Sequence, residues 1–210
     1  GQRVQLIRPL DFLVITDHAE FLGLAPMVHA SHPDLLAHPW GKEIHDLFQS
    51  GPEGRAEAFL RIIVAGTTGE NPWEAPAVAQ SNWQDFVEKA ETYDDPGRFS
   101  AMTGFEWSST PNGNNLHRVV IFADGAEKTG QTLPYSQFES FDPEDLWRYL
   151  AAYEEKTGGQ AIAIPHNGNL SNGLMFAETD FKGKPITKEY AMQRARWEPL
   201  HEMSQIKGDG

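Results

Sequence analysis

Short apolar segments typical of β-strands alternate along the chain with amphipathic segments typical of helices. The strand candidates are 12–15, 101–105, 119–122 and 161–164, with a weaker one at 200–206. The helical candidates are 56–65, 83–93, 142–157 and 187–197. Strand and helix in series predict an α/β protein with a largely parallel sheet. Such sheets place their chemistry at the carboxyl ends of the strands, so candidate site residues are sought there.

Local patterns add detail to this prediction. The run 12–15 is continuously apolar, which predicts a strand covered on both faces. The segment 56–65 is apolar on most sides, which predicts a buried helix. A helix is expected to begin after Asp142 and to end at Gly158. We expect loose connections over 23–40 and 68–76, because Pro, Gly and His are frequent in both.

Composition excludes several classes of protein. A length of 210 residues predicts one domain, here taken as 1–210. The net charge of −13 argues against a nucleic-acid-binding domain, because such domains neutralise phosphates with Lys and Arg. The chain has no cysteine, which excludes disulfides, thiolate metal sites and a cysteine nucleophile. No apolar run approaches the roughly 20 residues that a membrane span needs.

Two histidines and two carboxylates follow predicted strands. Asp17 and His18 come directly after the first strand, Glu106 follows the second, and His166 follows the fourth. Imidazole and carboxylate are the ligands of zinc, manganese and iron sites, and Asp17 could orient a neighbouring ligand. The alternative for each residue is a polar strand end or a helix cap. The sequence leaves these two interpretations balanced.

Other histidines are weaker candidates. His117 opens a strand instead of closing one, so by itself it is better explained as a strand-entry residue. His29, His32, His38 and His45 cluster in a segment with no preceding strand, which favours an exposed loop and helix over a metal site. The functional alternative for this segment is a lid over the site. His201 and Glu202, on the weakest strand, receive no role.

Taken in order, these residues resemble a known pattern. TDHAE after a strand, GFE, a histidine entering a strand and IPHN are similar to the motifs of the PHP (polymerase and histidinol phosphatase) superfamily. The similarity is greatest to a bacterial branch of unknown function, through RPLDFLVITDHAE, GFEWSS, NLHRVVIF, IPHNGNLSNG and EPLHEMSQIKGD. The resemblance covers nearly the whole chain.

The resemblance implies a distorted (β/α)7 TIM-like barrel with two or three divalent metals, such as Mn, Zn or Fe, at one end. The metal ligands it implies are His18, Glu106, His117 and His166. The HxH motif that opens the family pattern and the late Asp/His motif are absent, unless Asp209 begins the latter. We therefore expect a partial chain of a longer protein, lacking the first and last barrel segments and of doubtful activity alone.

The expected activity is metal-dependent hydrolysis of a small, anionic and phosphorylated substrate. The catalytic residues would be Asp17, His18 and Glu106, and Asn167 or Asn169 would bind substrate. Two alternatives stay open: hydrolysis of an amide or lactone on the same scaffold, and a non-catalytic metal-binding or interaction module. Oligomeric state and compartment, whether cytoplasmic or exported, are not determined by the sequence.

Overall fold

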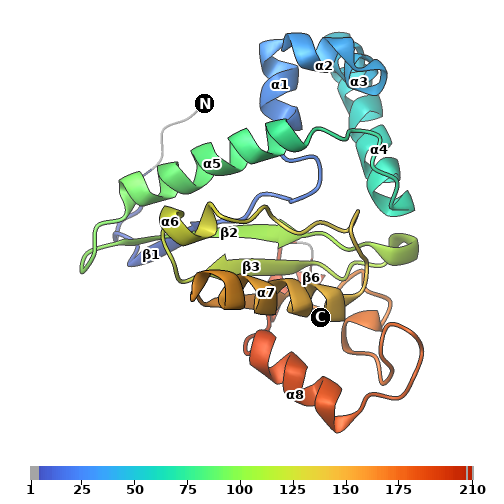
Figure 1. The fold of residues 1–210 in the computed structure, drawn as a ribbon. Helices are drawn as coiled ribbons and strands as arrows, with labels where there is room; N and C mark the ends of the chain where they lie inside the picture. Colours follow the sequence, from blue (N-terminus) through green and yellow to red (C-terminus); the bar gives the residue numbers. More distant parts are fainter. Residues whose placement is uncertain (1–4, 207, 210) are drawn as a thin grey trace.

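The computed structural model describes residues 5–206 and 208–209, and its centre is a four-stranded mixed sheet (Figure 1). The strand order follows the chain: β1 (Phe12–Ile15), β2 (Ser100–Trp107), β3 (Arg118–Phe122) and β4 (Ala161–Pro165). β1 pairs in parallel with β2, whereas β3 is antiparallel to both of its neighbours. β1, β2 and β4 therefore point in one direction and β3 in the other. A separate small sheet pairs β5 (Ser204–Gln205) with β6 (Gly208–Asp209).

The predictions of a barrel and of a largely parallel sheet are wrong. In the part of the chain that the structure describes, the sheet is open, with β1 and β4 at its edges. The reason lies between β2 and β3, where residues 108–117 contain only the short 3-10 helix η1 (Pro111–Gly113). A parallel crossover needs a dozen or more residues and usually a helix, so this short connection forces the chain to return antiparallel.

Helices precede, follow and cover the sheet. Their bounds are α1 (Leu24–Ala30), α2 (Pro33–Ala37), α3 (Pro39–Gln49), α4 (Pro52–Thr68), α5 (Pro76–Tyr93), α6 (Ala126–Thr129), α7 (Pro143–Thr157) and α8 (Lys188–Trp197); η2 (Leu174–Phe176) is a 3-10 turn. The expected ends of α7 are confirmed. The Asp142 side chain accepts a hydrogen bond from Glu144 N, and Gly158 adopts φ 64° at the other end.

The segment 23–40, expected to be loose, is largely helical, and this expectation is wrong. Two of its histidines act as N-caps: His32 accepts a hydrogen bond from Asp34 N and His38 accepts one from Gly41 N. A proline occupies the first turn of both helices, where its missing N–H costs nothing. Sequence rules that look for Ser, Thr, Asp or Asn caps do not detect these helix starts.

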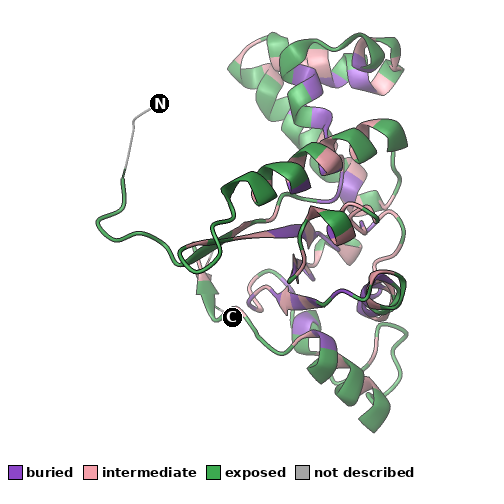
Figure 2. Cartoon of the chain, turned by 60° about the vertical axis from the view of Figure 1, so that its left-hand side comes forward, coloured by how far each residue is buried: buried purple, intermediate pink, exposed green. Residues whose placement is uncertain are grey.

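Two hydrophobic clusters form the interior (Figure 2). The larger lies between one face of the sheet and α5, α7 and α8, and its largest members are aromatic: Trp83, Phe105, Trp107, Phe122, Trp147, Tyr153 and Trp197. The smaller holds α1 to α4 together around Leu24, Met27, Val28, Leu35, Ile44, Ala58 and Trp73. On β3 and β4, buried and half-buried residues alternate, as expected when one face of a sheet meets the core more closely.

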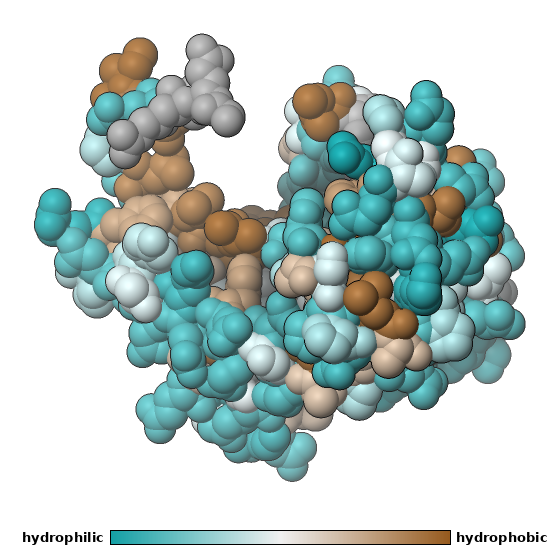
Figure 3. Space-filling model, turned by 90° about the horizontal axis from the view of Figure 1, so that it is seen from above, coloured by the Kyte–Doolittle hydropathy of each residue, from teal (hydrophilic) through white to brown (hydrophobic). Residues whose placement is uncertain are grey.

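Two predictions of burial are wrong. β1 is an edge strand, and Phe12, Leu13 and Ile15 are exposed. The helix predicted over 56–65 is real, but α4 exposes Phe59, Leu60, Ile63 and Val64. Seen from above, the surface is mainly hydrophilic, with separate hydrophobic patches and a hollow (Figure 3). Within the described residues, no helix combines the length and apolarity that crossing a bilayer requires.

Candidate metal centre

The direction of the strands brings four sequence-predicted residues to one end of the sheet, where β1, β2 and β4 finish. His18 lies just beyond β1, Glu106 is near the end of β2, and His166 follows β4. Because β3 is antiparallel to these strands, its first residues lie at the same end of the sheet, and His117 immediately precedes it. The position of His117 at a strand entrance is therefore what brings it to the site.

Backbone hydrogen bonds fix the segment that carries His18. Glu106 N donates to Asp17 O, and Ala19 N donates to Glu106 O, each at 2.9 Å. These two bonds extend the parallel pairing of β1 and β2 by an isolated bridge between His18 and Glu106. The imidazole and the carboxylate are therefore held side by side by the backbone itself.

Glu106 is the centre of the cluster. Its Oε1 lies 2.8 Å from Nδ1 of His117 and 3.0 Å from Nε2 of His166. Its Oε2 lies 3.7 Å from Nδ1 of His18. The side chains of Glu106, His117 and His166 are nearly buried, whereas that of His18 is 60% exposed. Three imidazoles thus surround one carboxylate, and His18 faces solvent.

The spacing of three of these side chains fits a metal ion. The ligand atoms of His18, Glu106 and His117 all lie within 4.8 Å of one another. Two ligands on one tetrahedral zinc, each about 2.1 Å from it, are about 3.4 Å apart. A small adjustment of the side chains would therefore suffice for them to share an ion. His166 adjoins this group through Glu106.

The electrostatics of the cluster favour the protonation states of metal ligands. Burial alone would raise the pKa of Glu106, but hydrogen bonds from His117 and His166 and the nearby His18 outweigh it and hold this pKa well below its usual range. Burial lowers the pKa of His117, even though Glu106 opposes the shift. The carboxylate is therefore charged near pH 7 and the His117 imidazole is neutral, which are the metal-binding forms.

Residues around the cluster orient the imidazoles. Ser108 Oγ is hydrogen-bonded to Nδ1 of His18, and Thr110 Oγ1 lies 3.1 Å from Nε2 of His117. Gln205 Nε2 lies 3.3 Å from Nδ1 of His166. For His117 and His166 this contact is at the ring nitrogen that does not face Glu106, whereas Ser108 bonds to the same His18 nitrogen that faces Glu106. In metal sites, contacts to the second ring nitrogen fix the tautomer and the ring orientation of the ligand.

The C-terminal segment supplies part of this support. Glu202 Oε2 accepts hydrogen bonds from Asn167 N at 3.1 Å and from Gln205 Nε2 at 2.6 Å. Glu202 also donates its backbone N–H to Pro165 O at 3.2 Å, so this part of the chain contacts the segment that carries His166.

Comparison with known proteins places the chain in a family. Residues 1–210 match the family described as "Protein of unknown function (DUF3604)". The chain belongs to this family. No curated protein and no solved structure matches it.

Three other residues predicted for the site of this DUF3604 chain lie near the cluster without joining it. Asp17 is exposed, and its carbonyl, not its carboxylate, bonds to Glu106. Asn167 is fully buried; its Nδ2 donates to Gly208 O and its Oδ1 accepts from Asn169 N. These bonds hold the turn after β4. Catalytic or substrate-binding roles for Asp17, Asn167 and Asn169 stay predictions.

The residues that support the cluster in this DUF3604 chain were not predicted from the sequence. Glu202 and Gln205 lie far along the chain on a weak strand candidate, of which only Ser204–Gln205 is β-structure. Glu20 is buried, and its Oε1 accepts from the backbone N–H groups of Ser108 and Gln137. Its signal was the uncommon string of Asp, His and Glu directly after an apolar strand.

Proposed function

We propose that this chain is a metal-dependent hydrolase of the PHP type of chemistry, acting on a small anionic phosphoester. His18, Glu106 and His117 would hold one divalent ion, and Glu106 with His166 would contribute to a second. The observation that carries the proposal is the grouping of three imidazoles around one charged, nearly buried carboxylate at the end of the sheet where β1, β2 and β4 finish. The similarity of TDHAE, GFE and IPHN to the PHP motifs supports it.

The expected roles of the site residues differ with their burial and contacts. Both oxygens of Glu106 face imidazoles, Oε1 those of His117 and His166 and Oε2 that of His18, so this carboxylate adjoins all three histidines. His18 is the most exposed of the four and would border the side from which substrate and water arrive. Divalent metal held here would lower the pKa of water toward about 7 and neutralise charge on a phosphoryl group. Ser108 would keep the His18 ring in place through its hydroxyl.

The net charge of the chain would favour an anionic substrate only with metal bound in the site. The chain carries a net charge of −13, which repels a phosphoester at long range. Two divalent ions in the site would reverse the local field, because bound cations are the largest charges in such a centre. Substrate binding in this proposal therefore depends on metal loading.

The proposal is tested by metal content and phosphoesterase activity measured together. We expect the purified protein, supplied with Mn, Zn or Fe, to hold two equivalents of metal by mass spectrometry and to hydrolyse p-nitrophenyl phosphate or its diester. The variants His18→Ala, Glu106→Gln and His166→Ala should each lose metal. Their activity should fall by more than the roughly 10- to 100-fold typical for loss of a hydrogen bond to a metal ligand.

His29→Ala is the matched control, since His29 is exposed on α1 and lies outside the cluster. Unchanged metal content in all three cluster variants would overturn the metal centre. Metal that binds and is lost as expected, without hydrolysis of any phosphoester offered, would overturn the hydrolase and leave a non-catalytic metal-binding module.

A further inference from the structure

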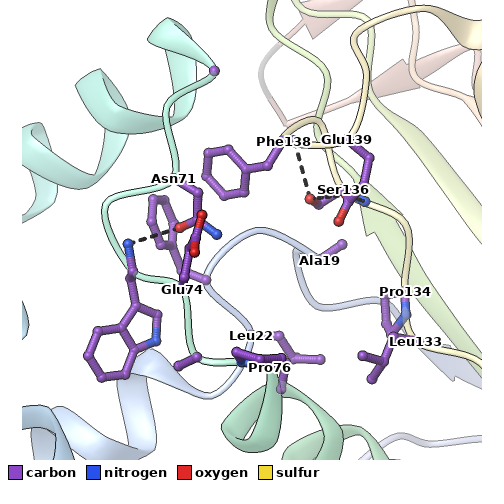
Figure 4. A pocket seen from close by; sticks show the side chains of 15 residues that line it. Ala19, Leu22, Asn71, Glu74, Pro76, Leu133, Pro134, Ser136, Phe138 and Glu139 are labelled. Carbon is purple, nitrogen blue, oxygen red and sulfur yellow. Dashed lines mark hydrogen bonds between the residues drawn. The ribbon is translucent and has the colours of Figure 1, made fainter.

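A cavity lies beside the segment that carries His18. It has a volume of about 520 Å³ and is bounded by three stretches of chain, 19–22, 69–79 and 133–139 (Figure 4). Cavities of roughly 300–1,000 Å³ are the usual size for small-molecule sites. None of the residues in the metal cluster lines this cavity, although Ala19 of its wall directly follows His18.

The charged side chains that line the cavity are all acidic. Among its fifteen lining residues, the ionisable side chains are Glu74 and Glu139, and none is Lys, Arg or His. Figure 4 shows Glu74 on one side and Glu139 with Ser136 on the other. The Glu139 carboxylate is fixed by a 2.8 Å hydrogen bond from Ser136 N. Within residues 5–206 and 208–209, no hydrogen bond or ion pair engages the Glu74 carboxylate.

The apolar wall of the cavity contains three aromatic residues beside smaller aliphatic ones. It includes Phe21, Trp73 and Phe138. Phe21 adopts φ 58°, a left-handed conformation that is costly for a bulky side chain. Its ring is held by stacking on Trp40 at 5.4 Å and by an edge contact with Phe138 at 5.1 Å. Aromatic faces attract cations through the ring quadrupole.

We propose that this cavity binds an organic cation, an ammonium group carried on a small apolar body. Glu74 and Glu139 would bind the ammonium group, and the aromatic wall would contact the body. The N-terminus of α5, at Pro76, also borders the cavity and contributes a partial charge of about +0.5. Two full carboxylate charges outweigh this partial charge, so the cavity selects cations over anions.

The experiment compares three probes of one shape: benzylamine, benzyl alcohol and benzoate. Binding to the full chain is measured by calorimetry, in chelator-treated and in metal-supplied protein. We expect benzylamine to bind roughly ten-fold more tightly than benzyl alcohol, and benzoate not to bind. In the double variant Glu74→Gln/Glu139→Gln, the preference for benzylamine over benzyl alcohol should disappear. Both glutamates are exposed, so the fold should survive, which circular dichroism checks.

Glu155→Gln is the control, because Glu155 is an exposed glutamate on α7 outside the cavity. Equal affinity for benzylamine and benzyl alcohol, tighter binding of benzoate, or a preference that survives the double variant would each overturn the proposal. The result is separate from the metal centre. His18→Ala should keep its benzylamine affinity, whereas the cavity variant should keep its metal.

Discussion

Single buried carboxylates join segments of this protein that are far apart in sequence. Glu20 accepts hydrogen bonds from the backbone of Ser108 and of Gln137, and so ties the His18 segment to two other loops. Burial raises the pKa of Glu20, although these bonds oppose the shift. Glu198 acts similarly at the start of β3, where it pairs with Arg118 and accepts a hydrogen bond from Trp147 Nε1. Such residues specify which loops meet around the site.

Asp124 offers a test of this role that does not depend on metal. Its Oδ2 accepts hydrogen bonds from Gln160 N at 2.6 Å and Tyr153 Oη at 3.0 Å, and its Oδ1 pairs with Lys128 at 2.9 Å. Burial would raise the pKa of Asp124, but these three partners outweigh it and lower the pKa below its usual value. The charged form is therefore stabilised by folding. That stability is present above the unfolded pKa of about 3.9 and is lost as pH falls through the folded value.

We predict that Asp124→Asn lowers the free energy of unfolding at pH 7 by about 1–2 kcal/mol, since an amide cannot accept at both oxygen positions. Urea denaturation at pH 7, 5 and 3 should show the difference from wild type shrinking below about pH 4. Asp85→Asn, at an exposed site on α5, should have little effect at any pH. A deficit in Asp124→Asn that is constant or larger at pH 3 would contradict this explanation.

Among the elements, β2 positions Glu106 and depends on close packing with both neighbouring strands. β2 is an inner strand that pairs with β1 on one side and β3 on the other, and Gly104 lies where both neighbours approach. A Cβ at Gly104 would lie 2.5 Å from Val120 O, 2.8 Å from the side chain of Val14 and 2.9 Å from that of Thr16. The carbonyl of Val120 belongs to the sheet and cannot move aside without breaking the ladder. The glycine is therefore required by close packing.

We predict that Gly104→Ala destabilises the protein by about 1–3 kcal/mol, the usual cost of overpacking. The change should also displace Glu106, two residues further along the strand, and so weaken metal binding. Thermal and urea unfolding measure the first effect, and competition with a chelator measures the second. Gly125→Ala is the control, since its Cβ would make ordinary contacts at 3.4 Å and beyond. Equal stability of the two variants would show that β2 tolerates the side chain.

For the whole molecule, the dominant property is an excess of negative charge. The net charge of −13 is spread over a surface that is largely hydrophilic in Figure 3. Like charges on a folded protein repel one another and destabilise its compact form. Salt screens this repulsion, with a Debye length of about 10 Å at 0.1 M.

We therefore predict that the Tm rises by roughly 2–4 °C between 20 and 200 mM NaCl, which corresponds to about 1 kcal/mol for a chain of this length. Differential scanning calorimetry in the presence of chelator gives this value without interference from bound metal. The double variant Glu53→Gln/Glu155→Gln removes two exposed charges and should respond less to salt. If the Tm falls with salt, ion pairs and not repulsion dominate the surface.

The sequence by itself determined the local elements and which types of side chain follow the strands. Apolar runs predicted β1 to β4, cap residues predicted α7, and polar residues after strands predicted His18, Glu106 and His166 as a group. These signals act over a few residues: side-chain periodicity, capping and the chemical nature of a ligand do not depend on distant contacts. The strands β1 to β4 and the ends of α7, which rested on such local signals, are therefore among the predictions that the structure confirms.

Only the tertiary structure decided which strands pair, the open sheet and the place of His117. The short connection 108–117 makes β3 antiparallel to β2, whereas the pairing of β3 with β4 joins residues far apart in the chain. Long-range contacts also bring Gln205 to His166 and Glu202 to Gln205 and Asn167. Local patterns carry no information on which strand lies next to which, because that choice depends on the burial and hydrogen bonding of the whole sheet. The barrel that the resemblance implied is therefore wrong, whereas the four metal ligands that it implied do lie together.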